Sequence, residues 1–247
     1  GTSSFTTSTA NDDITLDQVS LFTGAVSLAT NGATGDIGVT NVGQALNLGT
    51  VTTTLGGALV VETNVGSITD SGVITASGTS SFTTTTAGDD ITLNSLSSYT
   101  GAVTLSVNGA TGNAEISNAQ IALNLGTITT TAGGTLIIET DSGSITDSGV
   151  ITASGTSSFT TTTAGDDITL DQISSFTGAV SLNTNAGAGS DASLTNAAIA
   201  LDLGASTIGG SLTAETNAGS ITDSGILTVG GTSSFTTSTA NDDITLD

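Results

Sequence analysis

The sequence predicts an all-β fold, a parallel β-solenoid of about twelve coils. Three observations predict it: a long internal repeat, short stretches in which apolar and polar residues alternate, and a composition that suits strands and tight turns. Only 36% of the 247 residues are apolar, and the chain contains 33 Gly but no Trp, Met or Pro. Thr, Val and Ile favour strands, whereas Gly, Asn and Asp favour turns. A strand that is hydrogen-bonded on both sides also excludes proline.

The repeat is the strongest of these signals. The heptapeptide GTSSFTT begins at Gly1, Gly78, Gly155 and Gly231, so its copies follow one another at nearly equal intervals. We therefore divide one continuous solenoid segment, 1–247, into repeats 1–77, 78–154 and 155–230 and a partial repeat, 231–247. Residues 231–247 reproduce residues 1–17 letter for letter, so we expect the sequence to be a window of a longer array. Repetition at a fixed period is typical of folds in which each unit contacts only its neighbours.

Each repeat is expected to contain several short strands, because alternating apolar residues share one face of a strand. Strands of about five residues, separated by short turns, group into coils of about 20 residues, with about four coils in each repeat. Twelve such coils stacked about 4.8 Å apart would form a rod about 60 Å long. The group around residues 45–57 is too short for its boundaries to be placed. In the first repeat the alternating positions are Ile14/Leu16, Val26/Leu28, Ile37/Val39, Leu46/Leu48, Leu59/Val61 and Ile68.

A tandem array of small β-sandwich domains is the alternative fold. The solenoid is favoured because the apolar residues are mostly of one size, which suits stacked rows of side chains. No Trp or pair of Cys marks an immunoglobulin-like centre, and no Pro-rich linker separates the units. A sandwich built from a single repeat, with one or two aromatic side chains, would also have a small core.

Stacked coils can place identical polar side chains above one another as ladders. The equivalent positions Asn47, Asn124 and Asp202 are candidates for such ladders. The equivalent aromatic residues Phe22, Tyr99 and Phe176 are candidates to fill one corner of the solenoid in each repeat.

Three segments resemble a known type of coil. GGALVVETNVGSITDSG (56–72), GGTLIIETDSGSITDSG (133–149) and GGSLTAETNAGSITDSG (209–225) are similar to coils of filamentous-haemagglutinin-type adhesins and related giant bacterial surface proteins. That resemblance implies a right-handed parallel β-helix, export to the cell surface, and a role in attachment or biofilm formation.

The charge balance excludes several classes of function. The chain has no Lys, Arg or His against 22 Asp and Glu, so it offers no cation for the phosphates of nucleic acid or for an anionic membrane surface. No apolar window reaches the length of a membrane-spanning helix, so we expect no direct membrane insertion. Without His or Cys, zinc sites and nucleophilic triads built on them are excluded. Two carboxylates alone could hydrolyse a glycoside, but here the carboxylates recur with the repeat, so we expect no enzyme.

One acidic pattern is a candidate metal site. Adjacent carboxylates in a turn, with Thr hydroxyls and backbone carbonyls nearby, offer the hard oxygen ligands that Ca²⁺ prefers. Bound Ca²⁺ would also reduce the self-repulsion of an acidic rod, whereas the simpler interpretation is that Asp-Asp suits a turn and a soluble surface. Neither an EF-hand loop nor a nonapeptide calcium repeat occurs. The pairs are Asp12/Asp13, Asp89/Asp90, Asp166/Asp167 and Asp242/Asp243.

The hypothesis that follows is a non-enzymatic structural segment of an extracellular or cell-surface filament or adhesin shaft, of bacterial origin. Its main partner would be itself, through further repeats of one long chain or through end-to-end stacking, and surface glycans are a second candidate partner. The alternatives are a glycan- or protein-binding module, with its site in the least regular stretch (residues 183–196), and a calcium-stabilised surface-layer or biofilm-matrix protein. Ice binding would need flat Thr rows on every coil, and we expect the Thr runs to recur only once per repeat.

Overall fold

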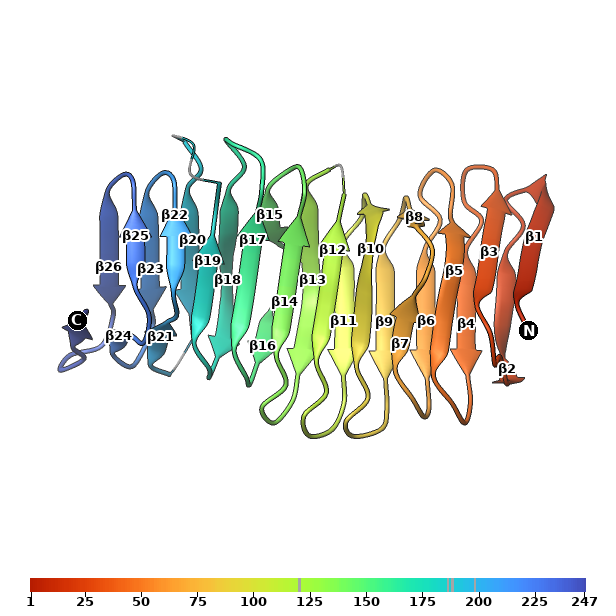
Figure 1. The fold of residues 1–247 in the computed structure, drawn as a ribbon, viewed down its shortest axis with the longest axis horizontal. Coiled ribbons are helices and arrows are strands. Elements are labelled where there is room, and N and C mark those ends of the chain that lie inside the picture. Colours follow the sequence, from red (N-terminus) through yellow and green to blue (C-terminus); the bar gives the residue numbers. More distant parts are fainter. Residues whose placement is uncertain (120, 186, 188, 198) are drawn as a thin grey trace.

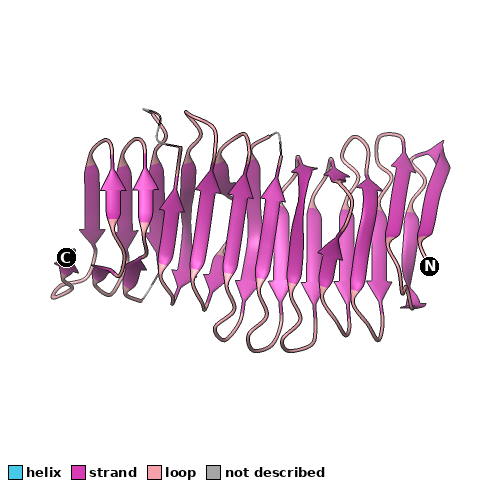
Figure 2. Ribbon diagram, viewed as in Figure 1, coloured by secondary structure: helices cyan, strands magenta, loops and turns pink. Residues whose placement is uncertain are grey.

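Two parallel β-sheets form the body of the molecule, and the chain passes from one sheet to the other at every turn (Figure 1). The computed structural model describes residues 1–119, 121–185, 187, 189–197 and 199–247. Its described part consists of strands and loops (Figure 2), and no helix in these ranges is long and apolar enough to cross a bilayer. The two termini lie at opposite ends of the stack (Figure 1). The prediction of an all-β parallel solenoid is confirmed.

We call the larger sheet sheet 1 and the smaller sheet 2. Sheet 1 contains β1 (Ser3–Ala10), β3 (Val26–Asn31), β5 (Leu46–Thr52), β7 (Ile68–Asp70), β8 (Ile74–Ala76), β10 (Ile91–Tyr99), β12 (Ala114–Asn118), β14 (Leu136–Thr140), β17 (Ser157–Thr161), β19 (Val180–Asn183), β21 (Leu201–Leu203), β22 (Ser206–Ile208), β24 (Ile221–Asp223), β25 (Leu227–Val229) and β27 (Ile244–Thr245). Sheet 2 contains β2 (Ile14–Ser20), β4 (Ile37–Asn41), β6 (Leu59–Thr63), β9 (Ser80–Thr84), β11 (Val103–Val107), β13 (Leu123–Thr130), β15 (Ile145–Asp147), β16 (Ile151–Ala153), β18 (Ile168–Phe176), β20 (Ala192–Asn196), β23 (Leu212–Thr216) and β26 (Ser233–Thr237).

The turns do not divide evenly into the sequence repeat. About 11 turns are stacked, and the step from β1 to β17, which is two repeats, takes seven of them. One repeat therefore occupies three and a half turns, and the expectation of four coils per repeat is wrong. As a result, the GTSSFTT strand lies in sheet 1 as β1 and β17 but in sheet 2 as β9 and β26. Equivalent residues of successive repeats thus lie on opposite sides of the solenoid.

The core is a single apolar cluster between the two sheets, extending from Ile14 to Ile221. Inward positions alternate along each strand, as in β6, where Leu59 and Val61 are buried and Val60 is exposed. Each aromatic residue that we expected at a corner packs edge-to-face on the Phe of the GTSSFTT strand in the opposite sheet. The three pairs and their ring-centroid distances are Phe5–Phe22 (5.9 Å), Phe82–Tyr99 (6.2 Å) and Phe159–Phe176 (5.9 Å). Such pairs contribute about 0.5–1.5 kcal/mol beyond their burial.

Some sides of the solenoid bend instead of running straight. In β5 the register with β3 shifts between Val26↔Leu48 and Leu28↔Val51, so one extra residue is accommodated near Gly49. In the following turn of sheet 1 the bend separates two short strands, β7 and β8, which pair with the two halves of β5. A side chain can close such a bend only if it supplies the hydrogen bonds that the interrupted ladder lacks.

Candidate functional site

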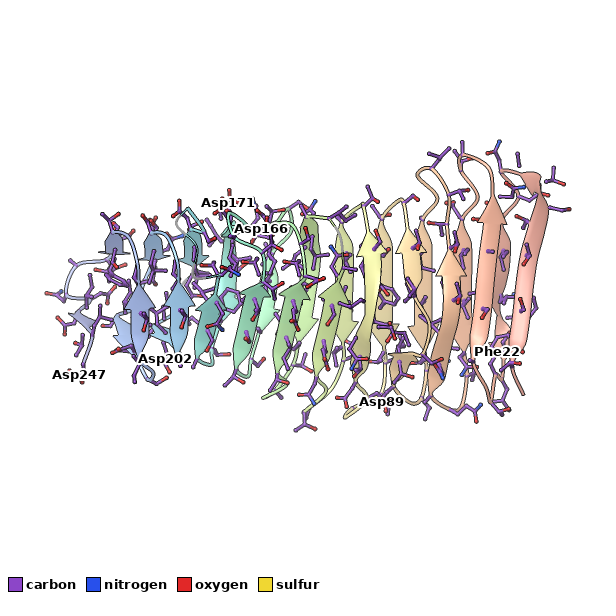
Figure 3. All side chains as sticks on the ribbon, turned by 45° about the horizontal axis from the view of Figure 1, so that its top comes forward. Phe22, Asp89, Asp166, Asp171, Asp202 and Asp247 are labelled. Carbon is purple, nitrogen blue, oxygen red and sulfur yellow. The ribbon has the colours of Figure 1, made fainter. Side chains whose placement is uncertain are left out.

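Each acidic pair lies in a turn that joins the two sheets. Because one repeat occupies three and a half turns, successive pairs alternate between the two long edges of the solenoid, and Figure 3 shows Asp89 at one edge and Asp166 at the other. Pairs on the same edge are seven turns apart, or about 34 Å. Asp12 and Asp13 follow β1, Asp89 and Asp90 follow β9, Asp166 and Asp167 follow β17, and Asp242 and Asp243 follow β26.

The first carboxylate of a pair accepts a hydrogen bond from the preceding turn in three of the four pairs. The donor is the backbone N–H of a glycine that has a positive φ, +92° at Gly66, and a Cβ at Gly66 would lie 2.2 Å from the backbone N of Ala45. The carboxylate thus satisfies a donor in a turn that only glycine can form. The bonds are Gly66 N to Asp89 Oδ2 (2.7 Å), Gly143 N to Asp166 Oδ2 (2.6 Å) and Gly219 N to Asp242 Oδ2 (2.8 Å).

The second carboxylate belongs to a ladder that runs along the solenoid edge. In this ladder a side-chain oxygen of one turn accepts a backbone N–H of the next, so each turn satisfies a donor of its neighbour. One ladder runs from Ser67 Oγ to Asp90 N (2.9 Å), Asp90 Oδ1 to Asn113 N (2.7 Å) and Asn113 Oδ1 to Thr135 N (2.9 Å). Another runs from Ser144 Oγ to Asp167 N (2.9 Å), Asp167 Oδ1 to Asp191 N (2.8 Å) and Asp191 Oδ1 to Ser211 N (2.6 Å).

The first and last pairs of the chain take part in ladders of the same kind. Asp13 Oδ1 accepts Asp36 N (2.9 Å), and Asp36 Oδ1 accepts Ala58 N (2.7 Å). At the other end of the chain, Asp243 N donates to Ser220 Oγ (3.0 Å), as Asp90 N does to Ser67 Oγ. The second residue of a pair therefore bonds to a neighbouring turn at both ends of the solenoid, through its carboxylate at Asp13 and through its backbone N–H at Asp243.

The two carboxylates of a central pair bond in opposite directions along the axis. Asp89 accepts from the turn before it and Asp90 from the turn after it. An ion bound there would use only the lone pairs that the backbone N–H groups leave unoccupied.

The structure does not gather the expected calcium ligands into a metal cluster. Within the described ranges no group of three or more His, Cys, Asp or Glu side chains is placed to hold a metal ion. Neighbouring pairs stay apart because they lie on opposite edges of the solenoid, so only two carboxylates meet in any one of these turns. Calcium binding by the pairs stays a prediction. The residues concerned are Asp12, Asp13, Asp89, Asp90, Asp166, Asp167, Asp242 and Asp243.

Sequence reasoning missed a second set of polar residues, which lie at the ends of β4, β12 and β20. Asn41, Asn118 and Asn196 are each 0% exposed. Each accepts the backbone N–H of the corner aromatic residue: Phe22 N to Asn41 (2.9 Å), Tyr99 N to Asn118 (3.1 Å) and Phe176 N to Asn196 (2.9 Å). Each also donates to carbonyls of the turn that follows, as from Asn196 to Ile199 O (3.2 Å) and Ala200 O (3.4 Å). The available signal was that this position is Asn in all three repeats.

The expected ladders at Asn47, Asn124 and Asp202 are not formed. The residue above each of them in the next turn is a Thr, namely Thr69, Thr146 and Thr222. The equivalent residues lie three and a half turns apart on alternate sheets, so they cannot stack on one another. Their Oδ1 atoms are buried and have no hydrogen-bond partner among the described residues.

A third kind of acidic residue lies at the bends. Asp147, 8% exposed, ends β15, and its Oδ1 accepts the backbone N–H groups of Asp171 (2.9 Å) and Gln172 (3.3 Å) in the next turn. Burial raises the pKa of Asp147 to about 6, the two backbone N–H groups oppose this rise, and the nearby Asp171 adds to it. Its equivalent Asp70 accepts the N–H groups of Asn94 and Ser95, and burial raises the pKa of Asp70 as well.

Comparison with known proteins identifies the repeat. A family described as "Repeats of unknown function (DUF5649)" matches residues 34–106, 111–183 and 189–247, which together make up most of the chain. The chain belongs to this family. The three DUF5649 matches start at positions 34, 111 and 189, a spacing that agrees with the sequence repeat. No curated protein and no solved structure matches the chain.

The outward faces of these DUF5649 repeats carry columns of hydroxyl groups. On sheet 2, five residues in consecutive turns are in register: Thr83, Ser106, Thr129, Thr152 and Ser175. On sheet 1 the equivalent column is Thr6, Ala29, Thr52, Thr75 and Ser98, in which Ala29 interrupts the hydroxyl groups. These columns do not depend on the Thr runs of the sequence, because strands with different sequences place Ser or Thr at most of the same register positions.

The least regular stretch of the DUF5649 array, residues 183–196, extends from the last residue of β19 to the end of β20. Ala186 and Ala188 lie outside the described residues. Within the rest, the Thr184 hydroxyl donates to Ser190 O (2.9 Å), and the Ser190 hydroxyl accepts from Gly165 N (2.8 Å). The second of these bonds connects the stretch to the preceding turn, so Ser190 takes a role like that of Asp89 and Asp166 elsewhere.

Proposed function

We propose that the chain is a non-enzymatic structural segment of a filament or adhesin shaft outside the cell. The observation that carries the proposal is the uninterrupted pairing across repeat boundaries. At the second boundary, β16 pairs with β18 of the next repeat, and β14 pairs with β17. The repeats share one core, since a single apolar cluster extends through all of them. Such a stack is stiff along its axis, and its length is set by the number of units.

Length scaling tests this proposal. Three and a half turns at about 4.8 Å give about 17 Å of rod for each repeat. We expect electron micrographs of natural arrays, and of arrays with two units removed, to show thin rods that differ in length by about 34 Å. Rods whose length does not follow the number of units, or chains of separate lobes, would contradict the shaft.

A location outside the cell is the second part of the proposal. It is supported by the absence of Lys and Arg, which leaves no trypsin site, and by the net charge of -22, which keeps rods apart in solution. An antibody raised against residues 231–247 should label intact cells of the natural source. Labelling only after the cells are opened would contradict a location outside the cell but would not contradict the proposed structural role.

Attachment to a neutral polysaccharide is a second candidate function, favoured by the hydroxyl columns. A chain with no cation at any side chain repels polyanions, whereas partly exposed hydroxyl groups in register can bond to a neutral polymer. We expect binding to insoluble cellulose or chitin, no binding to alginate, and weaker binding after T129V and T152V. The control T127V changes an exposed Thr of the same strand that lies outside the column. Equal binding by all variants would exclude the column as the contact.

Calcium stabilisation stays a prediction for the acidic pairs. If Ca²⁺ binds there, its addition should raise the melting temperature of the wild type, and a chelator should reverse the rise. D90N keeps an acceptor for Asn113 N but removes one charge, so it should reduce the effect. A wild type that melts at the same temperature with and without Ca²⁺ would exclude a stabilising ion.

A further inference from the structure

Two side chains close the bend between β15 and β16: Ser174 Oγ accepts the backbone N–H of Ile151 (3.0 Å), and Asp147 accepts from the next turn. In the next turn the register between β18 and β20 shifts between Leu170 and Ser174, so β18 bulges where the preceding turn bends. The backbone N–H groups at the start of this bulge, those of Asp171 and Gln172, both donate to Oδ1 of Asp147. The carboxylate therefore replaces the strand carbonyls that the bend has removed.

The other oxygen of the same carboxylate has no such partner. Oδ2 of Asp147 is buried and accepts no hydrogen bond from the part of the chain that the structure describes. An ionised oxygen in this situation has lost its water without gaining a donor, which disfavours the charged form.

No side chain of the protein can supply the missing positive charge. The chain contains no Lys, Arg or His. Of the strands that pair with β15, β13 carries no titratable side chain and β18 carries only Asp171, while β16, beyond the bend, carries none. Asp166 and Asp167 lie before the opposite end of β15, where Ser144 Oγ accepts from Asp167 N. The charge that faces Asp147 from these described strands is thus a second negative charge.

We propose that Asp147 is a proton-binding site, at which uptake of one proton on Oδ2 strengthens the β15–β18 bend as the medium becomes mildly acidic. The proton comes from solvent, no covalent bond other than O–H forms or breaks, and Oδ1 continues to accept the two N–H groups.

The direction of the pH effect follows from the pKa of Asp147. Its pKa is raised from 3.8 to about 6 in the folded chain, so the folded state binds this proton more readily than the unfolded state. The stabilisation is complete below about pH 4 and is lost as pH rises through about 6. This sign is opposite to that of a carboxylate in an ion pair.

The repeats supply a natural comparison. Asp70 is the equivalent residue one repeat earlier, and both of its oxygens accept the N–H of Ser95 (3.3 Å each). Where Asp147 faces Asp171, Asp70 faces Asn94. With both oxygens bonded and no second carboxylate on the facing strand, Asp70 should titrate at lower pH than Asp147.

Carboxyl ¹³C NMR of the full chain tests the site. We expect one carboxyl signal whose titration midpoint lies near the pKa of about 6 to which burial raises Asp147. This signal should be missing in D147N. D171N, an exposed substitution, should lower the midpoint of that signal, and N94D should raise the midpoint of Asp70. A full chain in which every carboxyl titrates below about pH 5 would overturn the proposal.

Thermal melting gives an independent readout. Between pH 4 and pH 7 the melting temperature of the wild type should fall relative to that of D147N measured at the same pH, because the other carboxylates ionise in both proteins. D17N is the matched control, since Asp17 is the exposed equivalent of Asp171 in the first repeat. The melting temperature of D17N should change with pH as that of the wild type does. If the melting temperatures of D147N and the wild type change equally with pH, protonation of Asp147 does not stabilise the fold.

Discussion

Replacing Asn196 with alanine tests whether the buried Asn residues hold the corners of the solenoid. The side chain is 0% exposed, accepts Phe176 N, and donates to Ile199 O and Ala200 O. Ile199 O keeps a second donor in the variant, the Thr216 hydroxyl at 3.1 Å. Two backbone groups therefore lose their partner, Phe176 N–H and Ala200 C=O. At about 1–3 kcal/mol for each unsatisfied group, N196A should lose about 2–6 kcal/mol of unfolding free energy.

Hydrogen exchange is the appropriate assay, because a solenoid can open locally and need not unfold in one step. The amide of Phe176 should exchange much faster in N196A, while amides of β4 and β6, many turns away, should keep their wild-type rates. Urea denaturation followed by circular dichroism gives the overall loss. The control is N94A, whose side chain is exposed, and its urea midpoint should stay close to that of the wild type. Unchanged protection of the Phe176 amide in N196A would refute the assignment of Asn196 as the group that holds this corner.

Three further predictions concern the core, the turns and the charge. F159A removes a fully buried ring that packs on Phe176. It should lose about 3–5 kcal/mol in urea denaturation, and a loss below about 1 kcal/mol would contradict a tightly packed corner. G149A places a Cβ 2.5 Å from backbone atoms of Gly126 and Thr127 and should destabilise the chain, whereas a Cβ at Gly38 meets no described atom within 4 Å. G38A should therefore be neutral or stabilising by up to about 1 kcal/mol, and the opposite order in urea midpoints would refute the turn-to-turn packing. Raising salt to about 1 M shortens the range of charge repulsion roughly tenfold from its value at about 0.01 M. Added salt should raise the melting temperature of a chain with net charge -22, and a fall would contradict this.

The strands were predictable because period-2 alternation is a local signal. Leu59 and Val61 are two residues apart in the sequence and face the core together in β6. The same rule fails at β5, where the bulge near Gly49 reverses the alternation, so that Val51 faces inward. A bulge is caused by the strands above and below it, and those lie one full turn away along the chain.

The number of turns per repeat was wrong for a related reason. In the sequence, Ile68–Asp70 and Ile74–Ala76 look like two strands separated by a turn, SGV, and so like parts of a regular succession of coils. In the structure both lie in sheet 1 and form one bent side of a single turn. Only the pairing partners, Leu46↔Ile68 and Val51↔Ile74, reveal that they share a side.

The candidate site was predicted in position but not in arrangement. Asp89 and Asp90 lie in a turn, as the composition of that segment indicates. The two carboxylates bond in opposite directions because Gly66 lies in the turn before them and Asn113 in the turn after them. No local sequence pattern shows which residues stack in neighbouring turns. Buried Asn residues such as Asn196 were missed because an Asn after a strand usually indicates an exposed turn, whereas here the turn folds over the residue and buries it.

The half-integral fit between repeat and turn has a consequence for how such an array can change length. Recombination between identical stretches, such as residues 66–93 and 143–170, gains or loses whole units. Each single unit gained or lost turns everything downstream by half a revolution, so that a surface formerly on one side of the rod comes to lie on the other. Because both sheets accept the same strands, as β1 and β9 do, the fold tolerates either outcome. Copy number therefore sets both the length of the rod and the direction in which its far end faces.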